Sequence, residues 1–172
     1  MTGGHSLPQA PRSAGQIRPK EYCPLPNLTL AKPDDLDRLD ALVATHHAEM
    51  EITQEAQTRR AALGALLDGA PHGAAYLIGP VRAPIGYVLL SFGWSIRQGG
   101  MIATLDEFFI RPGVRNRGIG AEVLTSLPKA LKGAGLKAVH VETPRTAARP
   151  QSLYRRMRFQ PRDDVLTLTR EV

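Results

Sequence analysis

Cysteine, aromatic residues and long apolar runs are all scarce in this chain. Cys23 is the one cysteine among 172 residues, so no disulfide can form within the chain, in agreement with a reducing compartment. Aromatic residues make up only 5% of the sequence, so the core has to be built mainly from aliphatic side chains. No run of about 18 apolar residues is present, and the N-terminal residues lack the apolar region of a secretory signal. We therefore expect a cytoplasmic protein that does not act at a membrane.

The chain does contain enough apolar material for one domain, and it has an excess of positive charge. Hydrophobic residues make up 42% of the sequence, and 22 basic against 16 acidic residues give a net charge of +6. The arginines are clustered, with three in residues 111–117 and six in residues 145–162. A nucleic-acid-binding protein more often carries a lysine-rich stripe with interleaved aromatic residues. The clusters therefore favour a small polyanionic cofactor over nucleic acid as the partner.

The order of the predicted elements favours a mixed α/β fold. Residues 1–26 contain five prolines and three glycines without an apolar period, so we expect a disordered or loosely draped lead before a single domain at 27–172. The apolar patterns predict strands at 27–31, 74–78, 85–92, 101–110, 137–142 and 165–168, and helices at 33–47, 56–67, 119–132 and 147–157. A mixed central sheet with helices on both faces follows, antiparallel in its first half and with a parallel crossover around residues 103–142.

The stretch 105–120 is the most informative segment. It contains a strand interrupted by Asp106 and Glu107, then a Pro-Gly turn, then the pattern Arg-x-x-Gly-x-Gly at a predicted helix start. Glycines at 118 and 120 let main-chain N–H groups approach a ligand, and a helix N-terminus carries partial positive charge, so a phosphate or pyrophosphate suits this place. Taken alone, the pattern is a plain helix start about as often as a phosphate site. Its position after the fourth strand argues against a dinucleotide-binding fold, and the lack of Gly-Lys-Ser/Thr argues against a P-loop.

The context of this segment resembles a known family. Arg115-Asn116-Arg117-Gly118-Ile119-Gly120 is similar to the Arg/Gln-x-x-Gly-x-Gly/Ala motif of the GNAT N-acetyltransferases, which use acetyl-CoA. The neighbouring strands and the late segment 153–159 match in order and spacing, so the resemblance covers roughly residues 27–170. Within the family, Leu105-Asp106-Glu107-Phe108-Phe109-Ile110 looks most like the diamine (spermidine/spermine) acetyltransferase branch. The resemblance implies an α/β (α+β) GNAT fold in which strands 103–110 and 137–142 splay apart at the cofactor.

The resemblance also implies site residues. The pantetheine arm would meet the strand Phe108, Phe109 and Ile110 through main-chain groups, and the pyrophosphate would be held by Arg115, Asn116, Arg117, Gly118, Ile119, Gly120 and Ala121. Tyr154 matches the family tyrosine near the thioester sulfur, where a phenol can donate a proton to the leaving thiolate. No metal is expected, because His46 and His47 lack a spaced third ligand and are taken as helix surface or pocket lining.

An amine must lose its proton before it can attack. With a pKa of about 10, roughly one alkyl amine in a thousand is neutral at pH 7, so a nearby carboxylate has to accept the proton. Strand alternation places Asp106 and Glu107 on opposite faces, and we slightly favour Glu107 because Asp106 would share the side of Phe108. The alternative is that both acids only neutralise neighbouring arginines.

Further residues are candidates for binding the acceptor. Glu49 and Glu51 follow the first helix and could bind a second ammonium, although a solvated helix end is at least as good an interpretation. Trp94 could line the acceptor pocket or simply pack at the end of the sheet. Two positions depart from the family pattern: Ala147 stands where an Asn contacts the cofactor arm, and Arg158 replaces a turn glycine.

These observations predict an acetyl-CoA-dependent N-acetyltransferase acting on a small primary amine, such as a di- or polyamine. The alternatives are a protein N-terminus or lysine as acceptor, a CoA-binding regulatory module without turnover and, more remotely, a nucleic-acid binder. A homodimer is expected, with residues 165–170 pairing across a two-fold axis.

Overall fold

The fold is built on one five-stranded sheet. The computed structural model describes residues 28–170, so the predictions for the N-terminal lead and for Cys23 lie outside the described residues. The strands lie in chain order: β1 (Leu28–Leu30), β2 (Gly73–Ile78), β3 (Gly86–Ser95), β4 (Gly100–Ile110) and β5 (Leu136–Val141). Strands β1 to β4 pair antiparallel, and β5 pairs parallel to β4. This confirms the predicted mixed sheet.

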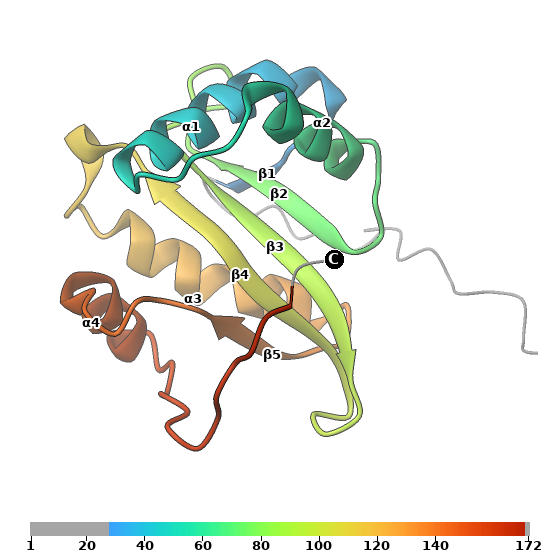
Figure 1. Cartoon of the computed structure of the whole chain (residues 1–172), viewed down its shortest axis with the longest axis vertical. Coiled ribbons are helices and arrows are strands. Elements are labelled where there is room, and N and C mark those ends of the chain that lie inside the picture. Colours follow the sequence, from blue (N-terminus) through green and yellow to red (C-terminus); the bar gives the residue numbers. More distant parts are fainter. Residues whose placement is uncertain (1–27, 171–172) are drawn as a thin grey trace, which may run out of the picture.

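Helices cover both faces of the sheet (Figure 1). A short 3-10 turn, η1 (Pro33–Asp35), leads into α1 (Leu36–Glu49), which packs with α2 (Ala56–Leu67) on one face. The other face is covered by α3 (Ile119–Lys132), which follows the 3-10 turn η2 (Pro112–Val114), and by α4 (Ala148–Arg156). Each face therefore has its own hydrophobic core. The candidate site residues lie in the C-terminal half of β4 and in the loop and helix that follow it.

A β-bulge in β4 changes which side chains face which core. Leu89 pairs with Glu107 while its neighbour Leu90 pairs with Leu105, so Asp106 is an extra residue on β4. Before the bulge, Leu105 packs into the α3 core, and after it Phe108 does so, one position out of step with simple alternation. Asp106 and Glu107 consequently face the same side, towards α1 and α2, and both line one cavity. The expectation of opposite faces was wrong, because it assumed a regular strand.

The end of β4 separates from β5. The parallel pairing stops at Leu105 and Val141, whereas β4 continues to Ile110. The Arg111 N–H donates to the Ile85 carbonyl at 2.8 Å, so by alternation the main-chain groups of Phe108 and Ile110 face away from β3. They point into the gap that β5 leaves open, which is the splay that the resemblance implied.

The predicted last strand is wrong. Residues 157–170 contain no strand, and the side chains that suggested one are exposed, with Leu166 at 79% and Leu168 at 84%. A cavity of about 1130 Å³ is lined by both β5 and this C-terminal segment, and the segment makes no ladder with the sheet edge. Pro161 and the turn at Asp163–Asp164 lie directly before the predicted strand at 165–168, and they interrupt the extended backbone there. Val165, Leu166 and Leu168 are all exposed, and three apolar residues without a neighbouring strand are too few to form one.

Candidate active site

The loop before α3 has the main-chain conformation expected of an anion-binding loop, here called the cradle. Asn116 and Gly118 both have positive φ, at 65° and 84°, and the first N–H groups of α3 follow directly. A Cβ at Gly118 would meet no protein atom within 4 Å, whereas one at Gly120 would lie 3.3 Å from the Leu153 Cδ2 atom of α4. Gly118 is therefore needed for its conformation, and Gly120 for close packing against α4.

Substitution of Gly118 tests the cradle. We expect Gly118→Ala to lower the free energy of unfolding by about 1 kcal/mol, because alanine is strained at this positive φ, and to weaken CoA binding measured by calorimetric titration. Gly113→Ala in the preceding turn is the matched control, since Gly113 does not have positive φ and its Cβ would also meet open space. Equal effects of the two changes would contradict a special role for Gly118.

Arg115 is directed into the protein. Its Nε atom donates to the Ile110 carbonyl at 2.6 Å, and its Nη1 and Nη2 atoms donate to the two carboxylate oxygens of Glu49 at 2.6 and 2.7 Å. The guanidinium carbon also lies 5.4 Å from the centre of the Phe109 ring. The hydrogen bond from Arg115 lowers the pKa of Glu49. Glu49 is thus already paired, and it can bind a second ammonium only if this ion pair opens.

Other arginines remain at the cradle. Arg117 is exposed beside it, and Arg149 of α4 donates from Nη2 to the Asn116 side-chain oxygen at 2.6 Å. Arg149 could not be identified from the sequence, because nothing in the spacing indicates that the start of α4 meets the loop before α3.

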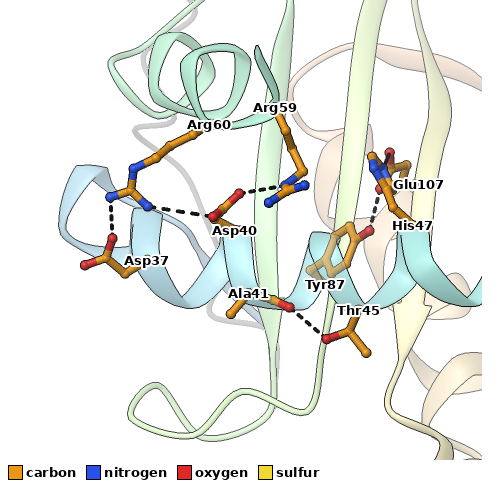
Figure 2. A network of polar contacts seen from close by, with 9 residues as sticks. All are labelled: Asp37, Asp40, Ala41, Thr45, His47, Arg59, Arg60, Tyr87 and Glu107. Atoms are coloured by element: carbon orange, nitrogen blue, oxygen red, sulfur yellow. Dashed lines mark hydrogen bonds and ion pairs between the residues drawn. The ribbon is translucent and has the colours of Figure 1, made fainter. Parts of the chain in front are cut away.

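Glu107 lies at the centre of a hydrogen-bond network (Figure 2). His47 Nε2 donates to Glu107 Oε1 at 2.8 Å, and the Tyr87 hydroxyl donates a short hydrogen bond to Glu107 Oε2. His46 Nδ1 lies 2.7 Å from the Tyr87 oxygen, so His46 donates there in the tautomer that satisfies all three contacts. Burial alone would raise the pKa of Glu107, but the hydrogen bonds from His46, Tyr87 and His47 outweigh it and lower the pKa to about 2. Glu107 is therefore a fixed anion.

The hydrogen-bond partners of Glu107 were not predicted from the sequence. His47 is only 6% exposed, and within residues 28–170 its Nδ1 atom has no hydrogen-bond partner. Burial and the hydrogen bond to Glu107 raise the pKa of Tyr87, so this phenol keeps its proton. The available signals were two adjacent histidines at the end of a helix and a tyrosine at the start of an apolar strand.

Asp106 has a different environment from its neighbour. It lines a cavity of about 370 Å³, here called the acceptor cavity, between α1, α2 and strands β2 to β4. Burial, followed by the charges of Glu107 and Glu142, raises the pKa of Asp106. In the described part of the chain its carboxylate takes no hydrogen bond and no ion pair. Asp106 is therefore the free carboxylate of the pair.

The remaining candidates do not line the acceptor cavity. Tyr154 of α4 is half-buried, its ring packs edge-on against Phe159 with centroids 5.6 Å apart, and burial raises its pKa. Trp94 is 75% exposed, so it neither packs at the sheet end nor lines the acceptor cavity. Glu51 is also exposed and outside the lining. Arg158 has a φ of 68°, the conformation for which a glycine was expected.

The comparison with known proteins places this geometry in a family. Residues 35–159 match the acetyltransferase (GNAT) family, and the chain belongs to it. No curated protein matches the chain. Because this family transfers acetyl groups from acetyl-CoA, the protein is an acetyl-CoA-dependent N-acetyltransferase.

Solved structures share the fold. An integron cassette protein from the mobile metagenome of Cole Harbour Salt Marsh is 26% identical, with a TM-score of 0.73 over 85% of this chain and 90% of that one. A predicted acetyltransferase from Clostridium acetobutylicum, solved with acetyl-CoA, is 16% identical, with a TM-score of 0.68 over 83% and 95% of the two chains. An aminoglycoside acetyltransferase from an uncultured soil metagenomic sample, in complex with sisomicin, is 13% identical, with a TM-score of 0.69 over 84% and 95%.

Among the helices of residues 28–170, none has both the length and the apolar character needed to cross a bilayer. In the same residues, no group of three His, Cys, Asp or Glu side chains lies together in a way that could hold a metal ion.

Proposed function

We propose that the acetyl acceptor is a small primary amine bound in the acceptor cavity, with Asp106 as the group that accepts its proton. The observation that carries the proposal is one free carboxylate in a cavity of about 370 Å³. This volume is at the lower end of the range for small-molecule sites, and its walls are mainly aliphatic. An amine on an apolar stem matches both properties.

The cofactor fits the residues present. The N–H groups at the start of α3, together with exposed Arg117, suit a pyrophosphate. The main-chain groups of Phe108 and the N–H of Ile110, which face away from β3, suit the amides of a pantetheine arm. Arg115, which the resemblance assigns to the pyrophosphate, is used instead for Glu49 and the Ile110 carbonyl. Acetyl-CoA supplies an acetyl thioester when it is bound.

The two neighbouring acids divide the work in this proposal. The sequence slightly favoured Glu107 as the base, but both of its oxygens accept hydrogen bonds and its pKa of about 2 makes it a weak proton acceptor. Asp106 has no such partners, and its raised pKa makes it the better base. Tyr154 keeps its proton and donates it to the sulfur as the carbon–sulfur bond breaks and the carbon–nitrogen bond forms.

The acceptor class is tested with a panel of amines. We expect turnover of acetyl-CoA with small primary alkyl amines, at a higher kcat/KM than with peptides that carry a free N-terminus or a lysine, because a peptide main chain brings polar groups into an aliphatic cavity. The release of CoA thiol is the measurement, and di- and polyamines belong in the panel because of the branch resemblance. Faster turnover of peptides would contradict the proposal. CoA binding without turnover of any amine would favour a regulatory module.

A further inference from the structure

We infer that the acceptor cavity selects an amine with a single ammonium on an apolar stem, because Arg59 holds a fixed cation where the distal end of a diamine would lie. This inference rests on the proposed function and deepens it. It separates monoamines from the di- and polyamines that the resemblance suggested.

The charged side chains that line the cavity leave one carboxylate available to bind an ammonium group. Asp106 is the free acid, whereas Glu107 already receives hydrogen bonds from His47 and Tyr87. The cation of the lining is Arg59 of α2, whose side chain is 13% exposed and whose Nε donates to Asp40 Oδ1 at 2.8 Å. The other polar lining residues, Gln54, His72 and Ser91, supply no carboxylate.

The spacing of these charges follows α1. Arg59 is hydrogen-bonded to Asp40 of α1, and Glu107 is hydrogen-bonded to His47 of the same helix (Figure 2). Asp40 and His47 are seven positions apart, which is about 10 Å along the helix at 1.5 Å per residue. Apolar side chains of α1, α2 and β3, such as Val43, Leu63 and Leu89, line the cavity. The seven bonds between the nitrogens of hexamethylenediamine span roughly 9 Å when extended. With one nitrogen at Asp106, its second ammonium would approach the Arg59 guanidinium.

No other described acid compensates for this repulsion inside the cavity. Glu49 is paired with Arg115 through both carboxylate oxygens. Glu51 is exposed and does not line the cavity. A second ammonium therefore loses its hydration and meets the Arg59 guanidinium, because the Asp40 carboxylate that pairs with Arg59 does not line the cavity.

The test compares hexylamine with hexamethylenediamine, which differ only in the second amino group. We expect kcat/KM to be about tenfold higher for hexylamine in the wild-type enzyme. Arg59→Gln should move the ratio of the two values about tenfold towards the diamine, because it removes the cation and leaves Asp40 negative. Arg60→Gln is the matched control: Arg60 pairs with Asp37 and Asp40 on the outer side, does not line the cavity, and should leave the ratio unchanged (Figure 2).

Equal or faster turnover of the diamine by the wild type would overturn the inference, and so would an unchanged ratio in Arg59→Gln. Titration of both amines into the protein with CoA bound gives a second readout that needs no acetyl transfer. Tighter binding of hexylamine in this titration supports the inference, and tighter binding of the diamine overturns it. Turnover of neither amine, by contrast, contradicts the proposed function, and the titration then still decides the question of selectivity.

Discussion

Asp106→Asn is expected to lower kcat by about 100- to 10,000-fold near neutral pH, while the affinity for CoA stays unchanged. Asparagine keeps the shape of the side chain but cannot accept the proton that the amine must lose. Asp106 lies on the bulge of β4 and lines the acceptor cavity, and it is not one of the cradle residues at the start of α3. Steady-state kinetics and calorimetric titration with CoA measure the two quantities separately.

The pH dependence adds a sharper criterion for Asp106. Burial and two neighbouring acids raise its pKa, so activity should fall as the pH drops through this elevated value, because the protonated carboxyl cannot act as a base. Glu142→Gln is the matched control: it removes one of these charges, should move the acidic limb of kcat/KM to lower pH, and should preserve turnover. An Asp106→Asn enzyme with the kcat of the wild type would show that another group takes the proton.

Glu107→Gln is expected to destabilise the fold at neutral pH much more than in acid. Hydrogen bonds from α1 and β3 lower the pKa of Glu107 from 4.5 to about 2, and at ~1.36 kcal/mol per pKa unit this corresponds to roughly 3 kcal/mol. The side chain is 21% exposed, and solvent screening reduces the expected loss to about 2 kcal/mol.

The sign follows from the direction of the shift. Because the folded state holds Glu107 ionised at lower pH than the unfolded chain does, its stabilisation is complete above about pH 4.5 and is lost as the pH falls towards 2. Urea unfolding of wild type and variant at pH 7 and near pH 3 measures the difference. Glu49→Gln should show a smaller change, since that carboxylate is 38% exposed. A Glu107→Gln penalty of equal size at both pH values would mean that its charge contributes nothing.

Much of the architecture could be predicted from the sequence because local pattern determines it. The helix expected at 56–67 coincides with α2, and the cradle follows from glycines before a helix start. The prediction of a last strand was wrong because the apolar residues at 165–168 do not indicate whether a sheet edge is available for pairing. Strand propensity is expressed only where another strand supplies the partner groups.

The arrangement of the acids could not be predicted, since it depends on two strands at once. The bulge exists because Leu89 and Leu90 of β3 skip one residue of β4, and nothing in residues 101–110 alone marks that position. The network around Glu107 joins residues 20 to 60 positions apart in the chain, from α1, β3 and β4. The use of Arg115 to bind Glu49, 66 positions away, has the same origin.

The bulge also constrains the length of β4. Without the extra residue, every side chain beyond Leu105 would change faces, so that Phe108 and Ile110 would leave the α3 core and Phe109 would leave its stack with His46. The loop that carries the cradle follows directly after this strand, so its orientation relative to the sheet would be reversed as well. A single-residue deletion in β4 would therefore shift its pairing register and reorient every site residue after the deletion. We expect this strand to tolerate substitutions far better than changes in length.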